Sequence, residues 1–120
     1  MRGRTALGHR AELAVVDYLV VRRFSILGQN VRLGALELDV VARQGPLVAV
    51  VEVRTRGKTS YQRPFESLDA TKRARLQRAV RRLWREQLKA MPGVERVRID
   101  VAAVTFEAGV TSVEYVEGAI

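Results

Sequence analysis

Two stretches of the chain repeat apolar residues at the three-to-four spacing of an amphipathic helix. In residues 7–22 the apolar stripe is formed by Leu7, Ala11, Val15, Tyr18 and Leu19. Thr5 precedes this stretch and is a typical N-cap, because its hydroxyl can accept a backbone N–H of the first turn. The second pattern covers residues 65–91 and ends before Pro92 and Gly93, which favour the end of a helix. The chain is therefore predicted to contain two helices.

Five other stretches are rich in β-branched residues, and these predict strands. They cover residues 24–33, 36–43, 47–53, 97–106 and 110–116. A polar stretch, residues 55–64, is predicted to be a loop before the long helix. We expect the first three strands to run antiparallel, and the strand at 97–106 to add in parallel after the long helix has crossed the sheet. The predicted order is α-β-β-β-α-β-β, an α/β domain with a mixed sheet.

Length and composition narrow the class of protein. The 120 residues suit one domain, and we expect residues 1–120 to form a single unit. Apolar residues make up 48% of the chain and charged residues 28%, as in globular proteins. The absence of cysteine excludes disulfides and thiolate chemistry. No apolar run approaches the roughly 20 residues that cross a membrane, and no apolar signal segment follows the basic N-terminus. We expect a cytoplasmic protein that makes no membrane contact.

Charge adds a first indication of function. Twenty-one Lys and Arg residues against thirteen Asp and Glu residues leave a net charge of +8. Arginine supplies most of the positive charge, and its planar guanidinium suits phosphate groups. Basic domains are candidates for nucleic-acid binding, although a basic surface can also serve solubility alone. Charge therefore favours nucleic acid as a partner without excluding the simpler explanation.

Four charged residues lie in or at the ends of apolar strands. Glu37 and Asp39 alternate along one predicted strand, and Glu52 and Arg54 along the next, so each pair shares one face of its strand. Isolated charges at such positions are costly and need partners. In one arrangement the carboxylates hold a hard cation such as Mg²⁺, which would activate water beside Glu52. In the other, Arg54 pairs with Asp39 or Glu37 in a cross-strand salt bridge.

Six short motifs follow one another between residues 8 and 104. They are Gly8-x-x-x-Glu12-x-Ala14, Asn30-x-Arg32, Glu37-x-Asp39, Val51-Glu52-Val53-Arg54-Thr55-Arg56, Lys72 and Arg98-Ile99-Asp100. Each motif is weak alone, but in this order they resemble the YraN-like family of uncharacterised bacterial proteins. That family in turn resembles nucleases of the PD-(D/E)xK class, including archaeal Holliday-junction resolvases.

The resemblance implies a restriction-endonuclease-like fold and a metal-dependent, structure-selective DNA endonuclease. Mg²⁺ or Mn²⁺ would be the cofactor, branched DNA the partner and a homodimer the working unit. Asp39 would be the motif aspartate and Glu52 the second acid, while Arg54 occupies the position of the motif lysine. Glu12 would be a further catalytic acid near the metal, and the carbonyl of Val53 a further ligand. The implied metal-ligand set is therefore Glu12, Asp39, Glu52 and Val53.

The chain departs from the family pattern at two positions. Leu36 stands where the family has a glycine before its Glu-x-Asp, and Gly34 lies two residues earlier. Arg54 keeps a positive charge but cannot act as a base, because arginine stays protonated in proteins; Lys58 and Lys72 are the alternatives for that role. The alternative function is a non-catalytic module that binds branched or single-stranded nucleic acid. A third is a protein that acts only through a protein partner.

Basic residues near the implied site are predicted to contact nucleic acid. They are Arg32, Arg56, Lys58, Lys72 and Arg75. At about 100° per residue, Lys72 falls on the sheet-facing stripe of the long helix, where it either reaches the site or passes it by snorkelling. An arc of basic residues on this helix is predicted to face away from the site, as a solvated face or a phosphate-contacting stripe. The arc consists of Arg75, Arg78, Arg81, Arg82, Arg85 and Lys89.

Overall fold

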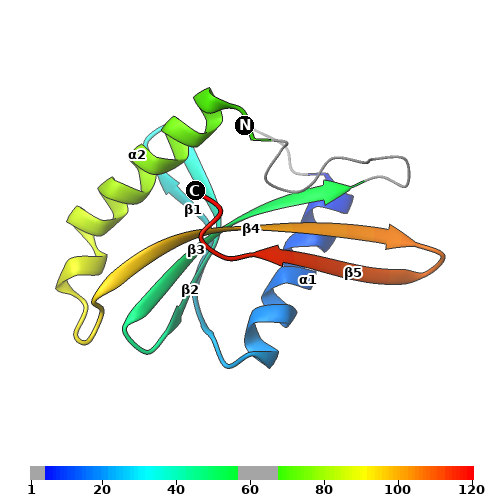
Figure 1. Ribbon diagram of the computed structural model, residues 1–120, viewed down its shortest axis with the longest axis horizontal. Coiled ribbons are helices and arrows are strands. Elements are labelled where there is room, and N and C mark those ends of the chain that lie inside the picture. The colour runs from blue at the N-terminus through cyan, green and yellow to red at the C-terminus, as the bar shows by residue number, and fades with distance from the viewer. Residues whose placement is uncertain (1–4, 57–67) are drawn as a thin grey trace.

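The computed structural model describes residues 5–56 and 68–120 (Figure 1). Its helices are α1 (Ala6–Val21), α2 (Ala70–Glu86) and the short 3₁₀ helix η2 (Leu88–Ala90). Its strands are β1 (Ser25–Leu33), β2 (Leu36–Gln44), β3 (Leu47–Arg56), β4 (Arg96–Glu107) and β5 (Val110–Val116). The predicted order α-β-β-β-α-β-β and the α/β character are confirmed.

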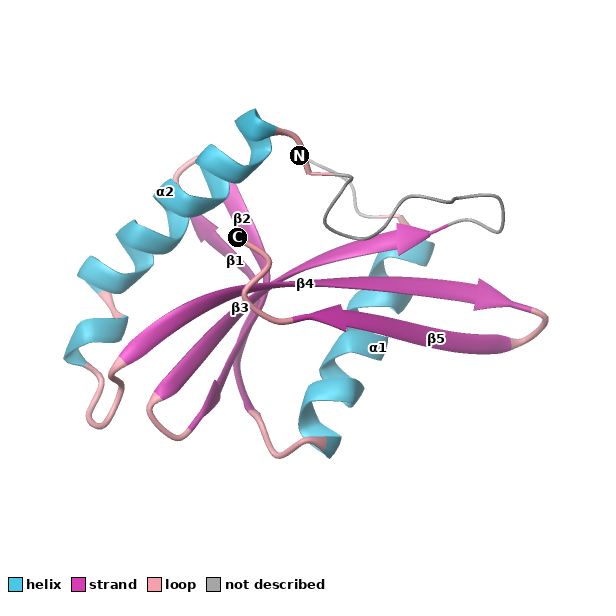
Figure 2. Ribbon diagram, viewed as in Figure 1, coloured by secondary structure: helices cyan, strands magenta, loops and turns pink. Residues whose placement is uncertain are grey.

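The strands form a five-stranded mixed sheet in the order β1-β2-β3-β4-β5 (Figure 2). β1, β2 and β3 pair antiparallel, as expected from their short connections. β3 and β4 pair in parallel because α2 carries the chain back across the sheet between them. β5 then returns antiparallel to β4. The predicted pairing of β2 with β3 and the parallel addition of β4 are both confirmed.

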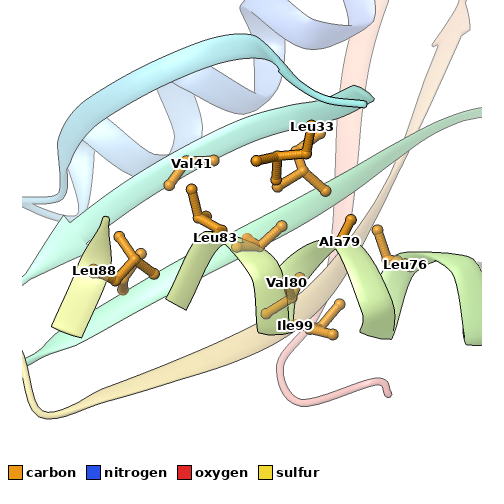
Figure 3. Packing of buried hydrophobic residues seen from close by; sticks show 11 residues of the cluster. Leu33, Val41, Leu76, Ala79, Val80, Leu83, Leu88 and Ile99 are labelled. Atoms are coloured by element: carbon orange, nitrogen blue, oxygen red, sulfur yellow. The ribbon is translucent and has the colours of Figure 1, made fainter. Parts of the chain in front are cut away.

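Each face of the sheet is covered by one helix and has its own apolar core (Figure 1). On one face, α1 contributes Ala11, Val15 and Leu19. On the other face, α2 contributes residues that point toward the sheet in Figure 3, namely Leu76, Ala79, Val80 and Leu83. Because β3 and β4 are covered on both sides, their central residues are buried whichever way they point. This two-sided burial explains their nearly continuous apolar sequences.

Capping residues decide where the helices begin. Thr5 caps α1 as predicted, with its Oγ1 accepting the N–H of Gly8 at 2.9 Å. α2 begins at Ala70, later than predicted, because Asp69 is its N-cap and accepts the N–H of Lys72 at 2.8 Å. The predicted helical residues 65–67 lie outside the described residues. No helix among the described residues is long and apolar enough to cross a membrane.

β3 is longer than its side-chain pattern predicts. It continues to Arg56, and its last two residues pair in parallel with Val104 and Thr105 of β4. The first part of the predicted polar loop is therefore strand, because backbone pairing with β4 outweighs the polar character of the side chains. Residues 57–64 of that predicted loop lie outside the described residues.

Candidate functional site

β2 and β3 separate at the end where Asp39 lies. The ladder between them runs only as far as Val40 opposite Val51, and the same register would place Asp39 opposite Glu52. Beyond the ladder, the carboxylate of Asp39 replaces a backbone carbonyl as hydrogen-bond acceptor, since its Oδ2 accepts the N–H of Val53 at 2.8 Å. Asp39 is therefore held at the junction of the two strands by the residue that follows Glu52. We call this place the β2–β3 junction.

Glu12 and Asn30 lie on the α1 side of this junction. Glu12 is 3% exposed, and its Oε1 accepts a hydrogen bond from Asn30 Nδ2 at 2.9 Å. Asn30 has a φ of 54°, a left-handed conformation that asparagine tolerates better than most residues. Its neighbours in β1 pair with the neighbours of Asp39 in β2, so Asn30 lies opposite Asp39. Asn30 was not among the predicted site residues, although an asparagine inside a strand is itself a signal, because strands are depleted in it.

Glu52 points to the other face of the sheet, toward α2. It is 6% exposed, and its Oε2 lies 3.4 Å from Lys72 Nζ and 3.6 Å from Arg54 Nη1. Lys72 was predicted either to reach the site or to pass it by snorkelling. The structure shows the first, since its ammonium group contacts Glu52. The cations provide Glu52 with the counter-charge that its burial requires.

The acids implied by the family resemblance are gathered near one junction but do not converge on one point. Glu12 belongs to the α1 face, Glu52 faces α2, and Asp39 lies between them at the β2–β3 junction. Among the described residues, no three His, Cys, Asp or Glu side chains form a group that could hold a metal ion. Val53 meets Asp39 through its N–H and not through its carbonyl. The predicted metal-ligand set therefore stays a prediction.

A surface cleft of about 410 Å³ lies between α2 and the β1–β2 turn. Its charged lining consists of Glu37, Glu52, Lys72, Arg75, Arg78 and Arg82. We call it the α2 cleft. Four basic side chains thus stand against two acidic ones, and Arg82 also forms an ion pair with Glu86 at 2.7 Å. The cleft has an excess of positive charge, with one buried acid in its wall.

The prediction that the basic arc of α2 faces away from the site is wrong for Arg75, Arg78 and Arg82, which line the α2 cleft. Arg81 lies on another side of the helix, near β4. The reason is side-chain length, because an arginine on the flank of a helix can extend its guanidinium over a neighbouring turn. The turn leaves room for this at Gly34, where an added Cβ would lie 3.0 Å from Arg82 Nη1.

The same turn accounts for the departure at Leu36. Gly34 has a φ of 65°, a conformation that glycine adopts without strain. Leu36 is already the first residue of β2, pairs with Leu33 and packs against the core on the α2 face. The glycine of the β1–β2 turn therefore lies two residues earlier than the family pattern has it.

The predicted nucleic-acid contacts do not all lie together. Lys72 and Arg75 line the α2 cleft. Arg32 is exposed on β1, and Arg56 forms an ion pair of 2.7 Å with a carboxylate of β5; neither belongs to the cleft lining. Lys58 lies outside the described residues.

A second charged cluster surrounds Asp100 of the Arg98-Ile99-Asp100 motif, although the sequence pattern did not predict that its members meet. This residue is 0% exposed and accepts hydrogen bonds from Arg98 Nε and Nη2 at 2.8 and 3.0 Å, Tyr115 OH at 2.6 Å and the N–H of Gly118 at 2.8 Å. The hydrogen bond to Asp100 raises the pKa of Arg98. Burial and then the same carboxylate raise the pKa of Tyr115. The Asp100 cluster thus ties the residues after β5 to β4.

Fold, junction and cleft define a mixed α/β protein with an acidic strand junction beside a basic cleft. Comparison with known proteins assigns it to a family. The model of the uncharacterised protein family UPF0102 matches residues 11–104, and the chain belongs to this family, which confirms the YraN-like resemblance. The match extends from the start of the buried face of α1 into β4, and so includes both the junction and the cleft.

Individual relatives agree with this assignment. A UPF0102 protein of Sorangium cellulosum is 52% identical over 117 residues, which cover 97% of this chain and 81% of the relative. A UPF0102 protein of Kineococcus radiotolerans is 40% identical and covers 98% of this chain and 96% of its own length. One from an Arthrobacter species is 35% identical, with 98% of both chains covered.

Proposed function

We propose that this protein is a nuclease-like DNA-binding protein that holds the phosphate backbone in the α2 cleft. The observation that carries the proposal is the charged lining of the cleft, in which four basic residues of α2 stand against two acids. The basic residues run from Lys72 to Arg82 along one helix, a span of about 15 Å at about 1.5 Å per residue. A row of cations of this length suits the repeated charges of a DNA strand.

The charge of the whole chain supports the same proposal. A net charge of +8 attracts DNA at a distance, and each phosphate neutralised by Lys or Arg releases bound counterions. Glu52 contacts Lys72 in the wall of the cleft. Its negative charge opposes DNA binding there, because a carboxylate repels a phosphate that approaches it. The resemblance to junction resolvases adds the expectation that branched DNA binds better than linear duplex.

Fluorescence anisotropy with labelled linear, flap and four-way-junction DNA tests the proposal. We expect micromolar or tighter binding at low salt and a steep loss of affinity as salt rises. Replacing Arg75 and Arg78 together by Gln should weaken binding and reduce the salt slope by about one for each phosphate that is no longer neutralised. The matched control replaces Arg81 and Arg85 of the same helix by Gln, which removes the same charge outside the α2 cleft.

Two outcomes would count against this function. Equal reductions in affinity for the two double variants would mean that charge alone, and not the cleft, holds the DNA. Affinity that is absent at low salt, or that does not change with salt, would favour a protein partner instead.

A second candidate function, metal-dependent phosphodiester hydrolysis, is favoured by the β2–β3 junction, where Asp39 lies beside the backbone of Val53 and next to Glu52. The described residues lack a three-ligand group, and Arg54 cannot act as a base. The side chains as placed therefore do not fit a divalent cation held by three carboxylates, and we derive no catalytic step through one.

A cleavage assay on the same three DNA substrates with Mg²⁺ and Mn²⁺ tests this second function. If it is correct, Asp39→Asn abolishes cleavage but leaves DNA affinity equal or higher, because one repulsive charge is removed. Arg54→Lys should raise cleavage if the missing motif lysine limits the reaction. Cleavage that survives Asp39→Asn would remove this assignment and leave DNA binding untouched, since the two are measured separately.

A further inference from the structure

The two edge strands of the sheet differ in their regularity. β1 has a register shift between Ile26 and Gly28 and a left-handed residue at Asn30, and it carries the charged Arg32. Bulges and charges of this kind prevent an edge strand from pairing with another chain. β5 pairs with β4 residue by residue from Val110 to Val116 without a register shift. It is therefore the regular edge of the sheet.

The sequence of β5 lacks the residues that usually protect an edge. Its seven residues, VTSVEYV, include no Lys, Arg or Pro. The only charged residue is Glu114, and its carboxylate pairs with Arg56 at 2.7 Å within the same chain. Within the described residues β5 is hydrogen-bonded only to β4. A regular strand of this kind presents alternate N–H and C=O groups outward for a further strand.

An apolar flank of α1 continues this edge. Figure 2 shows β5 at the margin of the sheet with α1 lying against one face. A shallow groove between them is lined by Ala14, Asp17, Tyr18, Val21, Arg22, Thr111 and Val113. Val21 is 77% exposed and, at the end of β5, Val110 is 61% exposed. The groove holds one acid and one base, so it is apolar or neutral in a chain whose net charge is +8.

We infer that β5 is the surface through which two copies of this chain pair, edge to edge and antiparallel. A two-fold axis perpendicular to the sheet keeps both α1 helices on the same face, so the two grooves meet across the seam. With the axis near Val113, the middle of β5, the β-branched Val113 side chains of the two copies face each other. Thr111 then lies opposite Tyr115 of the second copy, a favourable cross-strand combination.

Charge selects a second copy as the occupant. Two chains of +8 repel each other over most of their surfaces, and they can approach closely only where the surface is neutral. An acidic partner would instead be drawn to the basic surfaces, above all to the α2 cleft. That cleft lies at the β1–β2 end of the sheet, so pairing through β5 leaves both clefts accessible. The inference does not rest on DNA binding.

Sedimentation equilibrium over a range of protein concentrations tests the pairing. We expect a species of twice the 13.4 kDa chain mass. Val21→Lys and Thr111→Lys should each raise the dissociation constant at least about tenfold, because a two-fold contact carries every added charge twice. Val20→Lys is the matched control on α1, since Val20 is 53% exposed but does not line the groove. Gln29→Lys, at an exposed position of β1, is the control at the other edge of the sheet.

Single cysteines report the geometry directly, because the natural chain has none. Val113→Cys should form a disulfide-linked dimer under mild oxidation, since the two-fold axis brings the two Cα atoms of this residue within the roughly 4.4–6.8 Å that a disulfide needs. Gln29→Cys should not. Circular dichroism of each variant shows that the fold is intact. A monomer at every concentration, or a dimer that Gln29→Lys weakens and Val21→Lys does not, would overturn the inference.

Discussion

Glu52 of β3 and Asp100 of β4 are neighbouring buried carboxylates with different surroundings. They lie one register step apart, since Asp100 pairs with Val51, and they are 6% and 0% exposed. Asp100 accepts four hydrogen bonds of 2.6–3.0 Å. Glu52 is approached by Lys72 at 3.4 Å and by Arg54 at 3.6 Å. The first acid is enclosed by short hydrogen bonds, and the second has longer contacts with cations at a cleft.

The difference separates a carboxylate whose partners are shielded from water from one whose partners are partly open to it. The side chain of Arg98 is 20% exposed, so its pair with Asp100 is largely shielded from water. The side chain of Lys72 is 47% exposed, so water or a phosphate can compete for it. Burial does not distinguish Glu52 from Asp100, because both are buried. They differ in the number and length of their hydrogen bonds and in the exposure of their partners.

Removing Asp100 should have the largest effect on stability. Asp100→Ala leaves the Arg98 guanidinium without its main partner and the Tyr115 hydroxyl without an acceptor. We expect a decrease of about 3–5 kcal/mol in the free energy of unfolding, measured by urea denaturation. The control Glu95→Ala, at an exposed site just before β4, should change it by less than about 0.5 kcal/mol. Equal effects would mean that the Asp100 cluster does not hold the fold.

The hydroxyl of Tyr115 should have the next largest effect, and one that depends on pH. Burial and the contact with Asp100 raise the pKa of Tyr115 above its ordinary value of about 10. The raised pKa means that this contribution to stability is complete below about pH 10 and declines as pH rises beyond it. Tyr115→Phe should cost about 1.5–3 kcal/mol at neutral pH. It should also show a smaller fall in the free energy of unfolding between pH 9 and 11, because the natural protein begins to lose this contribution near the ordinary tyrosine pKa of about 10.

Glu52→Gln should affect binding more than folding. Its cations are partly exposed and can turn to water, so we expect a change of less than about 1 kcal/mol in the free energy of unfolding. DNA affinity should rise by roughly fivefold at low salt, because a charge about 4 Å from a phosphate contributes about 1 kcal/mol in water. A decrease of several kcal/mol in stability would instead make Glu52 a structural residue like Asp100.

Arg82→Ala should have the smallest effect on stability. Arg82 pairs with Glu86 one turn along α2, and both side chains are about half exposed. Such pairs contribute about 0.3–0.5 kcal/mol, far less than we expect for the buried contact of Arg98. If Arg82 contacts phosphate, the variant should still bind DNA more weakly. Denaturation and anisotropy on the same preparation separate the two effects.

Several features of the fold and of the site could be predicted because they depend on residues close together in the chain. Thr5 is a cap by its residue type and position, and alternation along β3 predicts that Glu52 and Arg54 share a face. The direction of three α2 arginines, Arg75, Arg78 and Arg82, was predicted wrongly, because helix periodicity does not include the reach of the side chain or the position of the β1–β2 turn. Asn30 was missed as a site residue because its contact with Glu12 joins residues 18 positions apart.

The sequence by itself determined the order of helices and strands, the apolar faces that they bury and the family to which the chain belongs. These depend on residue type and spacing within short stretches, and on motifs that keep their order. Only the tertiary structure decided that Asp39 is held by Val53, that Glu52 opens to a basic cleft and that Asp100 is enclosed. Those outcomes depend on strand register and on the packing of α2, which bring together residues that no local pattern relates.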